Sequence, residues 1–158
     1  MLEFVVLSKF DEATPHRTQV GSMNVLIGKK PAWRGISAAQ AAMLAQKVAE
    51  GAEKIAKATA KASAAAGTPA GPAAILNLAK VVAETVADIA STMTGFGADM
   101  HACPILKVAI PDGVGLVTNG SQTVLINGLA ACRMGDMIQE ATSVNTIAMG
   151  EPTVSIGG

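Results

Sequence analysis

The stretch that decides the fold is Gly120-Ser121-Gln122-Thr123-Val124-Leu125-Ile126. The same pattern stands earlier as Gly21-Ser22-Met23-Asn24-Val25-Leu26-Ile27, and a shortened copy follows later as Gly150-Glu151-Pro152-Thr153-Val154-Ser155-Ile156-Gly157. The first two copies stay similar further on, through Lys30-Pro31-Ala32-Trp33-Arg34 and Leu129-Ala130-Ala131-Cys132-Arg133. One such phrase would be an ordinary turn before a strand, but three copies indicate an internal repeat.

Each copy predicts a glycine-led turn that feeds a short strand. Side chains alternate between the two faces of a strand, so three pairs each share a face: Val25 with Ile27, Val124 with Ile126, and Val154 with Ile156. We expect these three faces to turn inward and to form a small core around a pseudo-threefold axis.

The sequence divides by composition into three parts. Residues 1–36 and 95–158 are rich in Gly, Val, Ile and Thr with frequent turn signals, which predicts short strands. Residues 37–94 are dominated by Ala, with Lys and Glu at helical spacing. The predicted fold is therefore mainly β, with one inserted helical segment.

Residues 37–94 predict two helices. Ser37 is a suitable N-cap for a first helix that ends near Ala66, and the Gly- and Pro-rich residues 67–72 separate it from a second helix between about Ala73 and Met93. The second helix has an apolar seam at alternating three- and four-residue steps, formed by Ile75, Leu78, Val82, Val86, Ile89 and Met93. A short turn between two amphipathic helices predicts an antiparallel hairpin.

A membrane-spanning hairpin is the alternative for this segment, because the second helix is long enough to cross a bilayer. Lys80, Glu84 and Asp88 would then lie in hydrocarbon, at about 2.5–3.5 kcal/mol each near its centre. We therefore expect no stable membrane span, and we interpret the hairpin as water-exposed or as a docking arm.

The composition narrows the function classes. The 158 residues contain 12 Lys and Arg and 12 Asp and Glu, so the net charge gives no reason to expect nucleic acid or an anionic membrane as a partner. Two cysteines are too few for a disulfide framework. The first residues lack a basic leader and a long apolar run, so we expect synthesis in the cytoplasm without a signal peptide and export by another route.

Several phrases, in order, resemble those of the PAAR-repeat proteins, which are named after a Pro-Ala-Ala-Arg stretch. Here that stretch is Pro31-Ala32-Trp33-Arg34 in the first copy and Ala130-Ala131-Cys132-Arg133 in the second. Asp99-Met100-His101-Ala102-Cys103-Pro104 is similar to an Asp-x-His-x-Cys-Pro phrase found in many members. The resemblance covers residues from about 10 to 36 and from about 97 onward, and it leaves out the helical segment.

The resemblance implies a small PAAR-type β-cone, divided into residues 1–36 and 95–158 by the inserted hairpin of residues 37–94. PAAR proteins bind the blunt end of the trimeric valine-glycine-repeat (VgrG-type) spike of type VI secretion systems and sharpen it for envelope penetration. On that basis we expect one tip per trimer, exported on the spike to the extracellular space or the target cell. A related phage-like injection machine stays open as the apparatus.

The resemblance also implies a metal, usually zinc, held near the tip by His and Cys side chains. The candidate ligands are His16, His101 and Cys103, with Glu140 or water to complete the site and Asp99 to orient His101. Such a metal would stabilise a narrow cone that has few aromatic residues. The alternative is that both histidines lie at the surface and that Cys103 packs as a small apolar residue.

No arrangement of residues predicts catalysis, because the sequence has no nucleophile elbow, no phosphate-binding glycine loop and no close carboxylate pair. We therefore expect a structural binding protein and not an enzyme. Two other classes stay open: an adaptor tip whose residues 37–94 recruit an effector or chaperone, and an enzyme in which the metal activates water.

Overall fold

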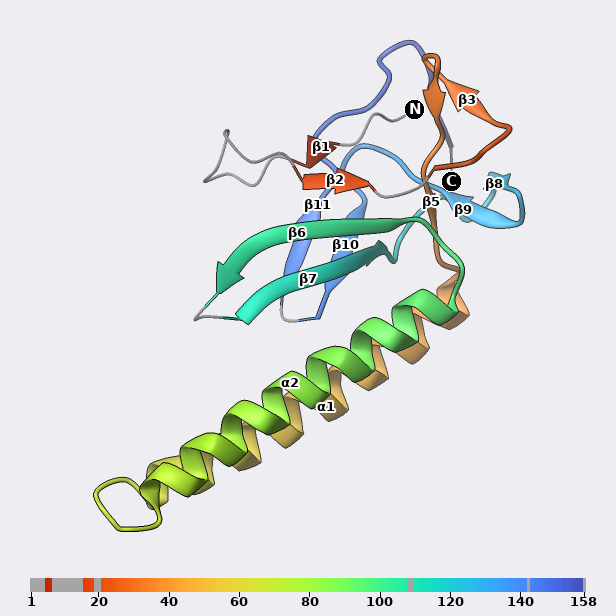
Figure 1. The fold of residues 1–158 in the computed structure, drawn as a ribbon. Helices are drawn as coiled ribbons and strands as arrows, with labels where there is room; N and C mark the ends of the chain where they lie inside the picture. The colour runs from red at the N-terminus through yellow and green to blue at the C-terminus, as the bar shows by residue number, and fades with distance from the viewer. Residues whose placement is uncertain (1–4, 7–15, 19–20, 108–109, 142, 158) are drawn as a thin grey trace.

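The computed structural model of the chain describes residues 5–6, 16–18, 21–107, 110–141 and 143–157. Of these, strand residues 5–6, 16–18, 103–107 and 110–113 are described by their backbone alone. The chain forms a β-rich body from which a long helical hairpin projects (Figure 1). No helix in the described ranges is both long and apolar enough to cross a membrane.

The described strands form three antiparallel sheets. The largest has six strands in the order β1 (Val5–Val6), β2 (His16–Thr18), β6 (Met100–Lys107), β7 (Ile110–Val117), β10 (Met137–Glu140) and β11 (Val144–Thr146). A two-stranded sheet pairs β3 (Leu26–Ile27) with β4 (Lys30–Pro31). A three-stranded sheet has the order β5 (Arg34–Gly35), β9 (Leu129–Ala131) and β8 (Leu125–Ile126).

The predicted helical hairpin is confirmed. Helix α1 spans Ala38–Ala64 and helix α2 spans Gly71–Gly95, and the two pack against each other. Ser37 caps α1 as expected: its hydroxyl accepts a hydrogen bond from the backbone of Gln40, whose side chain in turn accepts one from the backbone of Ser37. Helix α1 therefore begins where the sequence predicts.

The seam between the helices differs from the predicted one at its outer end. The buried residues of α2 are Gly71, Thr85, Ile89 and Met93, whereas Ile75 is 61% exposed. Partly buried Ala74 takes the seam position instead, one residue and thus about 100° away from Ile75 around the helix. The prediction that Ile75 lies in the seam is wrong.

The fold is mixed α/β, which corrects the expectation of a mainly β chain. The helices hold 27 and 25 residues, more than all the described strands together. Most of these strands have only two to four residues because the repeat is made largely of turns. The Ala-rich insertion has no such turns within either helix, so it forms the longest elements of the chain.

Two copies of the repeat fold in the same way. Each forms a hairpin, β3–β4 or β8–β9, around a two-residue turn in which both residues have positive φ: Gly28 (61°) and Lys29 (65°), or Asn127 (53°) and Gly128 (79°). This is the turn that suits the right-handed twist of paired strands. The hydrogen bond from Ser22 N to Ala32 O, 2.8 Å long, has its match from Ser121 N to Ala131 O, also 2.8 Å.

The isoleucines of all three copies meet in one apolar cluster. Ile126 is buried with Ala32 and Ala131, and Ile27 and Ile156 pack against them. The predicted inward positions are thus confirmed at the isoleucines, but the predicted third strand is wrong, because residues 150–157 form no strand. The prediction is wrong at two of the valines, because Val124 is 36% exposed and Val154 is 39% exposed.

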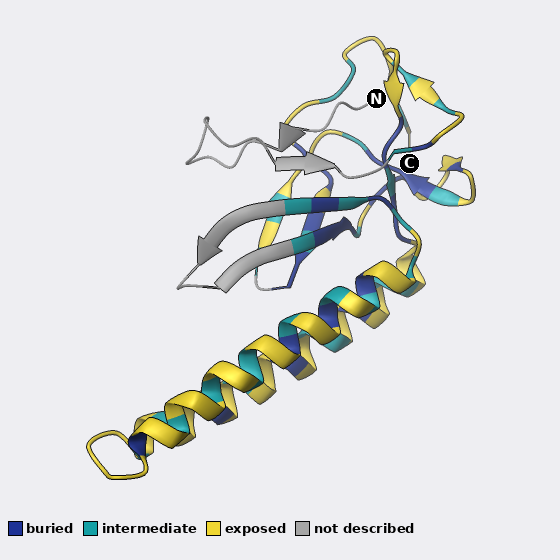
Figure 2. Cartoon of the chain, in the orientation of Figure 1, coloured by how far each residue is buried: buried dark blue, intermediate teal, exposed yellow. Residues whose placement is uncertain are grey.

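A second apolar cluster joins the hairpin to the large sheet. Ile36, Leu44, Ile89, Met93, Leu116 and Ala141 are buried together where the hairpin leaves the body. Beyond this base the hairpin is mostly exposed on its outer surfaces (Figure 2). Its inner end is therefore anchored, while its outer end extends away from the sheets.

Candidate functional site

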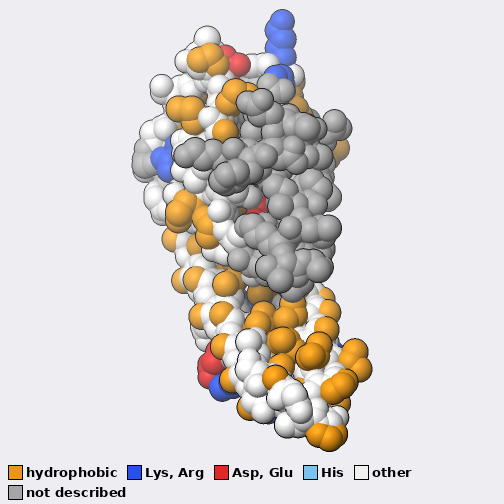
Figure 3. Space-filling model, turned by 90° about the vertical axis from the view of Figure 1, so that its left-hand side faces the viewer, with side chains coloured by type: hydrophobic (Ala, Val, Ile, Leu, Met, Phe, Trp, Pro, Cys, Tyr) orange, Lys and Arg blue, Asp and Glu red, His pale blue; other side chains and the backbone are white. Residues whose placement is uncertain are grey.

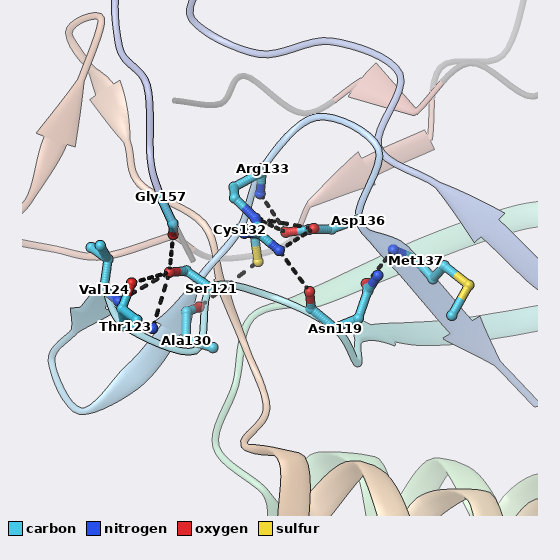
Figure 4. A network of polar contacts seen from close by, with 10 residues as sticks. All are labelled: Asn119, Ser121, Thr123, Val124, Ala130, Cys132, Arg133, Asp136, Met137 and Gly157. Atoms are coloured by element: carbon cyan, nitrogen blue, oxygen red, sulfur yellow. Dashed lines mark hydrogen bonds and ion pairs between the residues drawn. The ribbon is translucent and has the colours of Figure 1, made fainter.

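Side-chain contacts link each copy of the repeat to the next. The hydroxyl of Ser22 in the first copy lies 2.7 Å from Asn127 Oδ1, in the turn of the second copy. The hydroxyl of Ser121 in the second copy donates to Gly157 O in the third, at 2.6 Å (Figure 4). Ser22 and Ser121 hold the same place in their copies, as do Asn127 and Gly157.

The third copy contacts the first at the corresponding position. The carboxylate of Glu151 lies so close to Gly28 that a Cβ on this glycine would collide with it. Glu151 stands where the other copies have serine, and Gly28 directly follows Ile27 as Asn127 follows Ile126. The three contacts therefore connect the copies in a closed ring.

The ring carries exposed apolar side chains at equivalent positions. Leu26 and Leu125 lie in matching strands, and each is 61% exposed. Met23, three residues before β3, is 95% exposed. Large apolar side chains that are held out to solvent on a rigid hairpin are typical of a binding surface.

An arginine–aspartate contact closes the second copy. Asp136, which is 4% exposed, accepts hydrogen bonds from Arg133 N at 2.7 Å and from Arg133 Nη2 at 3.0 Å. The same Nη2 also donates to Asn119 O at 3.1 Å (Figure 4). The carboxylate thus fixes the turn that follows the Ala-Ala-Cys-Arg stretch.

The first copy has the same contact, but its partners lie far apart in the sequence. Asp99 accepts from Arg34 N at 2.8 Å and from Arg34 Nη2 at 2.7 Å, and its own N–H donates to Arg34 O. Arg133 and Asp136 are matched in every one of these bonds. The helical hairpin therefore occupies the place that two residues, Met134 and Gly135, occupy in the second copy.

Asp99 holds Arg34 in a bidentate ion pair, although we expected it to orient His101. Sequence reasoning missed this pairing because the hairpin separates the partners. A signal was present, since Asp99-Met100 opens a strand in the same way as Asp136-Met137.

His101 lies in a buried polar cluster. Its Nε2 is 2.9 Å from Glu140 Oε1, and both side chains are completely buried. Glu140 also accepts hydrogen bonds from the Ser143 hydroxyl and from Asn145 Nδ2. Burial raises the pKa of Glu140, but the hydrogen bonds from His101, Ser143 and Asn145 together lower it to about 2. The carboxylate is therefore ionised at neutral pH.

A glycine lets these two side chains meet across an intervening strand. Gly115 on β7 pairs with His101 on one side and with Glu140 on the other. A Cβ at this position would come within 2.9 Å of Glu140 Cγ and 2.8 Å of Ile138 Cγ2. The absence of a side chain at Gly115 is thus what permits the contact.

The other two candidate metal ligands are placed by their backbones only. Strands β2 and β6 are antiparallel, and Arg17 lies opposite Ala102. One step further along this pairing, the backbone of His16 comes next to that of Cys103. Their side chains lie outside the described part of the structure. Among the side chains that are described, no three His, Cys, Asp or Glu residues form a group that could hold a metal.

Comparison with known families agrees with the repeat. Residues 109–158 match the family model of the PAAR motif. This part of the chain is a PAAR motif. Comparisons with curated proteins and with solved structures found no significant match.

The matched part of the chain contains the second and third copies of the repeat. The first copy lies outside it, but the copy shares the turn and the Arg–Asp contact of the second. The PAAR motif indicates a protein associated with the spike of a secretion system.

Proposed function

We propose that this protein is the tip of a type VI secretion spike, a β-cone that caps a trimeric VgrG-type protein and sharpens it for envelope penetration. The observation that carries the proposal is the ring of contacts between the three copies. A single chain with three similar units offers a near-threefold surface to a threefold partner.

The exposed leucines supply the contact area in this proposal. Leu26 and Leu125 are equally exposed at equivalent positions, as contacts with two equivalent subunits of a trimer require. Strands β3 and β8, which lie at sheet edges among the strands that the structure describes, would extend the β-structure of the spike. The chain would then leave the cytoplasm with the spike and reach the extracellular space or the target cell.

Mixing with a trimeric VgrG-type spike fragment tests this function. We expect one chain per trimer by light scattering, and we expect Leu26→Glu with Leu125→Glu to weaken binding at least about tenfold, because charges replace central apolar contacts. Val144→Glu is the matched control, since Val144 is 53% exposed on the large sheet. An unaffected double variant, or a control that loses as much, would contradict the proposal.

A zinc ion held by His16, His101 and Cys103 forms part of the proposal. Two imidazoles and a thiolate are donors that zinc prefers, and a carboxylate bound to a ligating histidine, as Glu140 is to His101, is a common outer partner. The ion would tie β2 to β6 and stabilise the cone. Its chemistry here is structural, with no reaction assigned to it.

Elemental analysis tests the zinc site. We expect about one zinc per chain, and we expect His101→Ala and Cys103→Ala to lose it. Cys132→Ala is the control, because Cys132 is fully buried and burial raises the pKa of its thiol well above the ordinary value, which disfavours the ligating thiolate. A zinc-free wild-type protein after purification with added zinc would exclude the site.

A second candidate function is an adaptor whose hairpin recruits an effector or chaperone. The observation that favours it is that Met43, Ile75 and Leu76 are exposed outside the helix seam. A chain with a shortened hairpin would then still bind the spike but would fail to deliver one effector. Normal delivery of all effectors by that chain would exclude the adaptor function.

A further inference from the structure

The charged residues of the hairpin are unevenly distributed along its length, although the chain as a whole has no net charge. Residues 62–79, at the free end, contain no Asp, Glu, Lys or Arg. Directly behind them stand four lysines, Lys54, Lys57, Lys61 and Lys80, and no acidic residue lies between positions 54 and 83. All the acidic side chains of the hairpin are nearer to the β-rich body. We call residues 62–79 the free end and the four lysines the collar.

The free end presents large apolar side chains to solvent. Ile75 is 61% exposed and Leu76 is 72% exposed. Hydrophobic side chains gather at this end of the molecule in the space-filling view (Figure 3). The helix seam does not use them, so their exposure has no explanation in the packing of the hairpin itself.

Several polar groups of the turn at the free end are paired within the turn. The Thr68 hydroxyl donates to Ala65 O at 2.7 Å and accepts from Ala70 N at 3.3 Å. The backbone N–H groups of Thr68 and Gly71 donate to Ala65 O and Thr68 O. A turn with its backbone groups paired loses less free energy on leaving water than an open turn does.

The dimensions of the free end match the boundary region of a bilayer. Gly51 of α1 lies against Thr85 of α2, so counting ten residues outward along each helix places Ile75 level with Lys61; at 1.5 Å per residue this level is roughly 6–8 Å beyond Lys57 and Lys80. Interfacial helices bury their apolar side chains about 5–10 Å deep. Lys57 and Lys80 would then lie at the level of the lipid headgroups, with Lys54 further out and Lys61 reaching back to the phosphates along its flexible side chain.

We propose that the free end of the hairpin inserts shallowly into the surface of an anionic phospholipid bilayer, with the collar lysines on the headgroup phosphates. Insertion of this kind is peripheral and requires no membrane-spanning helix. It goes beyond capping of the spike and does not depend on it.

The distribution of charge favours a lipid surface over a protein partner. The collar lysines stand on both helices of the hairpin, behind an uncharged end. Both helices can therefore contact a planar anionic surface at the same time. Lys57 and Lys80 have ion pairs with Glu53 and Glu84, but all four side chains are at least 66% exposed, so these pairs are weak and the lysines stay available.

Sedimentation of the full chain with vesicles tests the proposal. We expect binding to vesicles of phosphatidylcholine with a quarter phosphatidylglycerol to exceed binding to pure phosphatidylcholine by at least about tenfold, and to fall as salt is added. Ile75→Ser with Leu76→Ser should weaken binding at least about tenfold. Changing the four collar lysines to Gln should remove the preference for the anionic lipid.

Met43→Ser is the matched control, because Met43 has the same 61% exposure at the anchored end of the hairpin. Its vesicle binding should equal that of the unmodified chain. As an independent readout, Leu76→Trp should shift its emission to the blue on anionic vesicles, and Met43→Trp should not. No binding to anionic vesicles, or equal losses at Met43 and at the free end, would overturn the proposal, as would collar-dependent binding without any effect of Ile75 and Leu76.

Discussion

At the scale of single residues, buried carboxylates fix the backbone of this protein. Asp99 and Asp136 each bind both the backbone N–H and the guanidinium of an arginine. Both aspartates are at least 96% buried, so each carboxylate depends on its arginine for charge compensation. The contact makes the end of the Pro-Ala-Ala-Arg-like stretch a rigid point in each copy.

Removal of one such carboxylate should be costly. We expect Asp136→Ala to lower the free energy of unfolding by about 2–4 kcal/mol, because Arg133 N and its guanidinium lose a buried charged partner. Chemical denaturation measures the loss.

Asp88→Ala is the control for this substitution. Asp88 pairs with Lys47 across the hairpin, but the pair is exposed and should contribute little. Equal effects at Asp88 and Asp136 would mean that burial of the carboxylate does not matter.

At the scale of elements, the hairpin is inserted at the place where the second copy has a two-residue turn. Its ends are joined by the Arg34–Asp99 contact, and its inner third is packed on the large sheet through Leu44, Ile89 and Met93. Gly51 lies midway along α1, beyond this part: a Cβ there would come within 2.6 Å of Thr85 Cγ2. The two helices therefore touch closely where Gly51 of α1 faces Thr85 of α2.

A shortened hairpin should leave the body intact. We expect a chain in which a short Gly-Ser loop replaces residues 52–84 to keep its near-ultraviolet spectrum and its binding to a spike fragment, because the cluster at the base is retained. Thermal unfolding and the binding assay check this.

Leu44→Ala in the full chain is the comparison. It should cost about 2–5 kcal/mol, since Leu44 is completely buried. A shortened chain that unfolds more readily than the Leu44 variant would show that the outer hairpin is needed for stability.

At the scale of the whole molecule, stability depends on joining three copies that are separate in the sequence. The third copy is short, and its Ile156 is partly buried against two clusters, one around Trp33 and one around Ile126. The Ser121–Gly157 hydrogen bond holds this segment against the second copy. A few residues thus complete the core of the body.

Two nearby substitutions in the third copy should differ in their effect on stability, because one side chain is packed and the other is exposed. We expect Ile156→Ser to lower the free energy of unfolding by about 1–3 kcal/mol, because an apolar contact between copies is lost. Val154→Ser, two residues earlier and 39% exposed, should change it by less than about 0.5 kcal/mol. Similar losses at both positions in chemical denaturation would contradict the joining of the copies through Ile156.

The sequence by itself determined the local structure. The Ser37 cap, the two helices and the short strands of the first two copies follow from backbone preferences that act over a few residues. The inward position of the isoleucines also followed from alternation along a strand. The PAAR phrases gave the family, which the match to residues 109–158 supports.

Only the tertiary structure decided which distant groups meet. Arg34 finds Asp99 across the whole hairpin, and His101 reaches Glu140 because Gly115 on the strand between them has no side chain. Alternation along a strand could not show that Val124 and Val154 are exposed, because burial depends on which neighbour covers a strand face. Contacts of this kind are set by the packing of whole elements, which local sequence patterns do not contain.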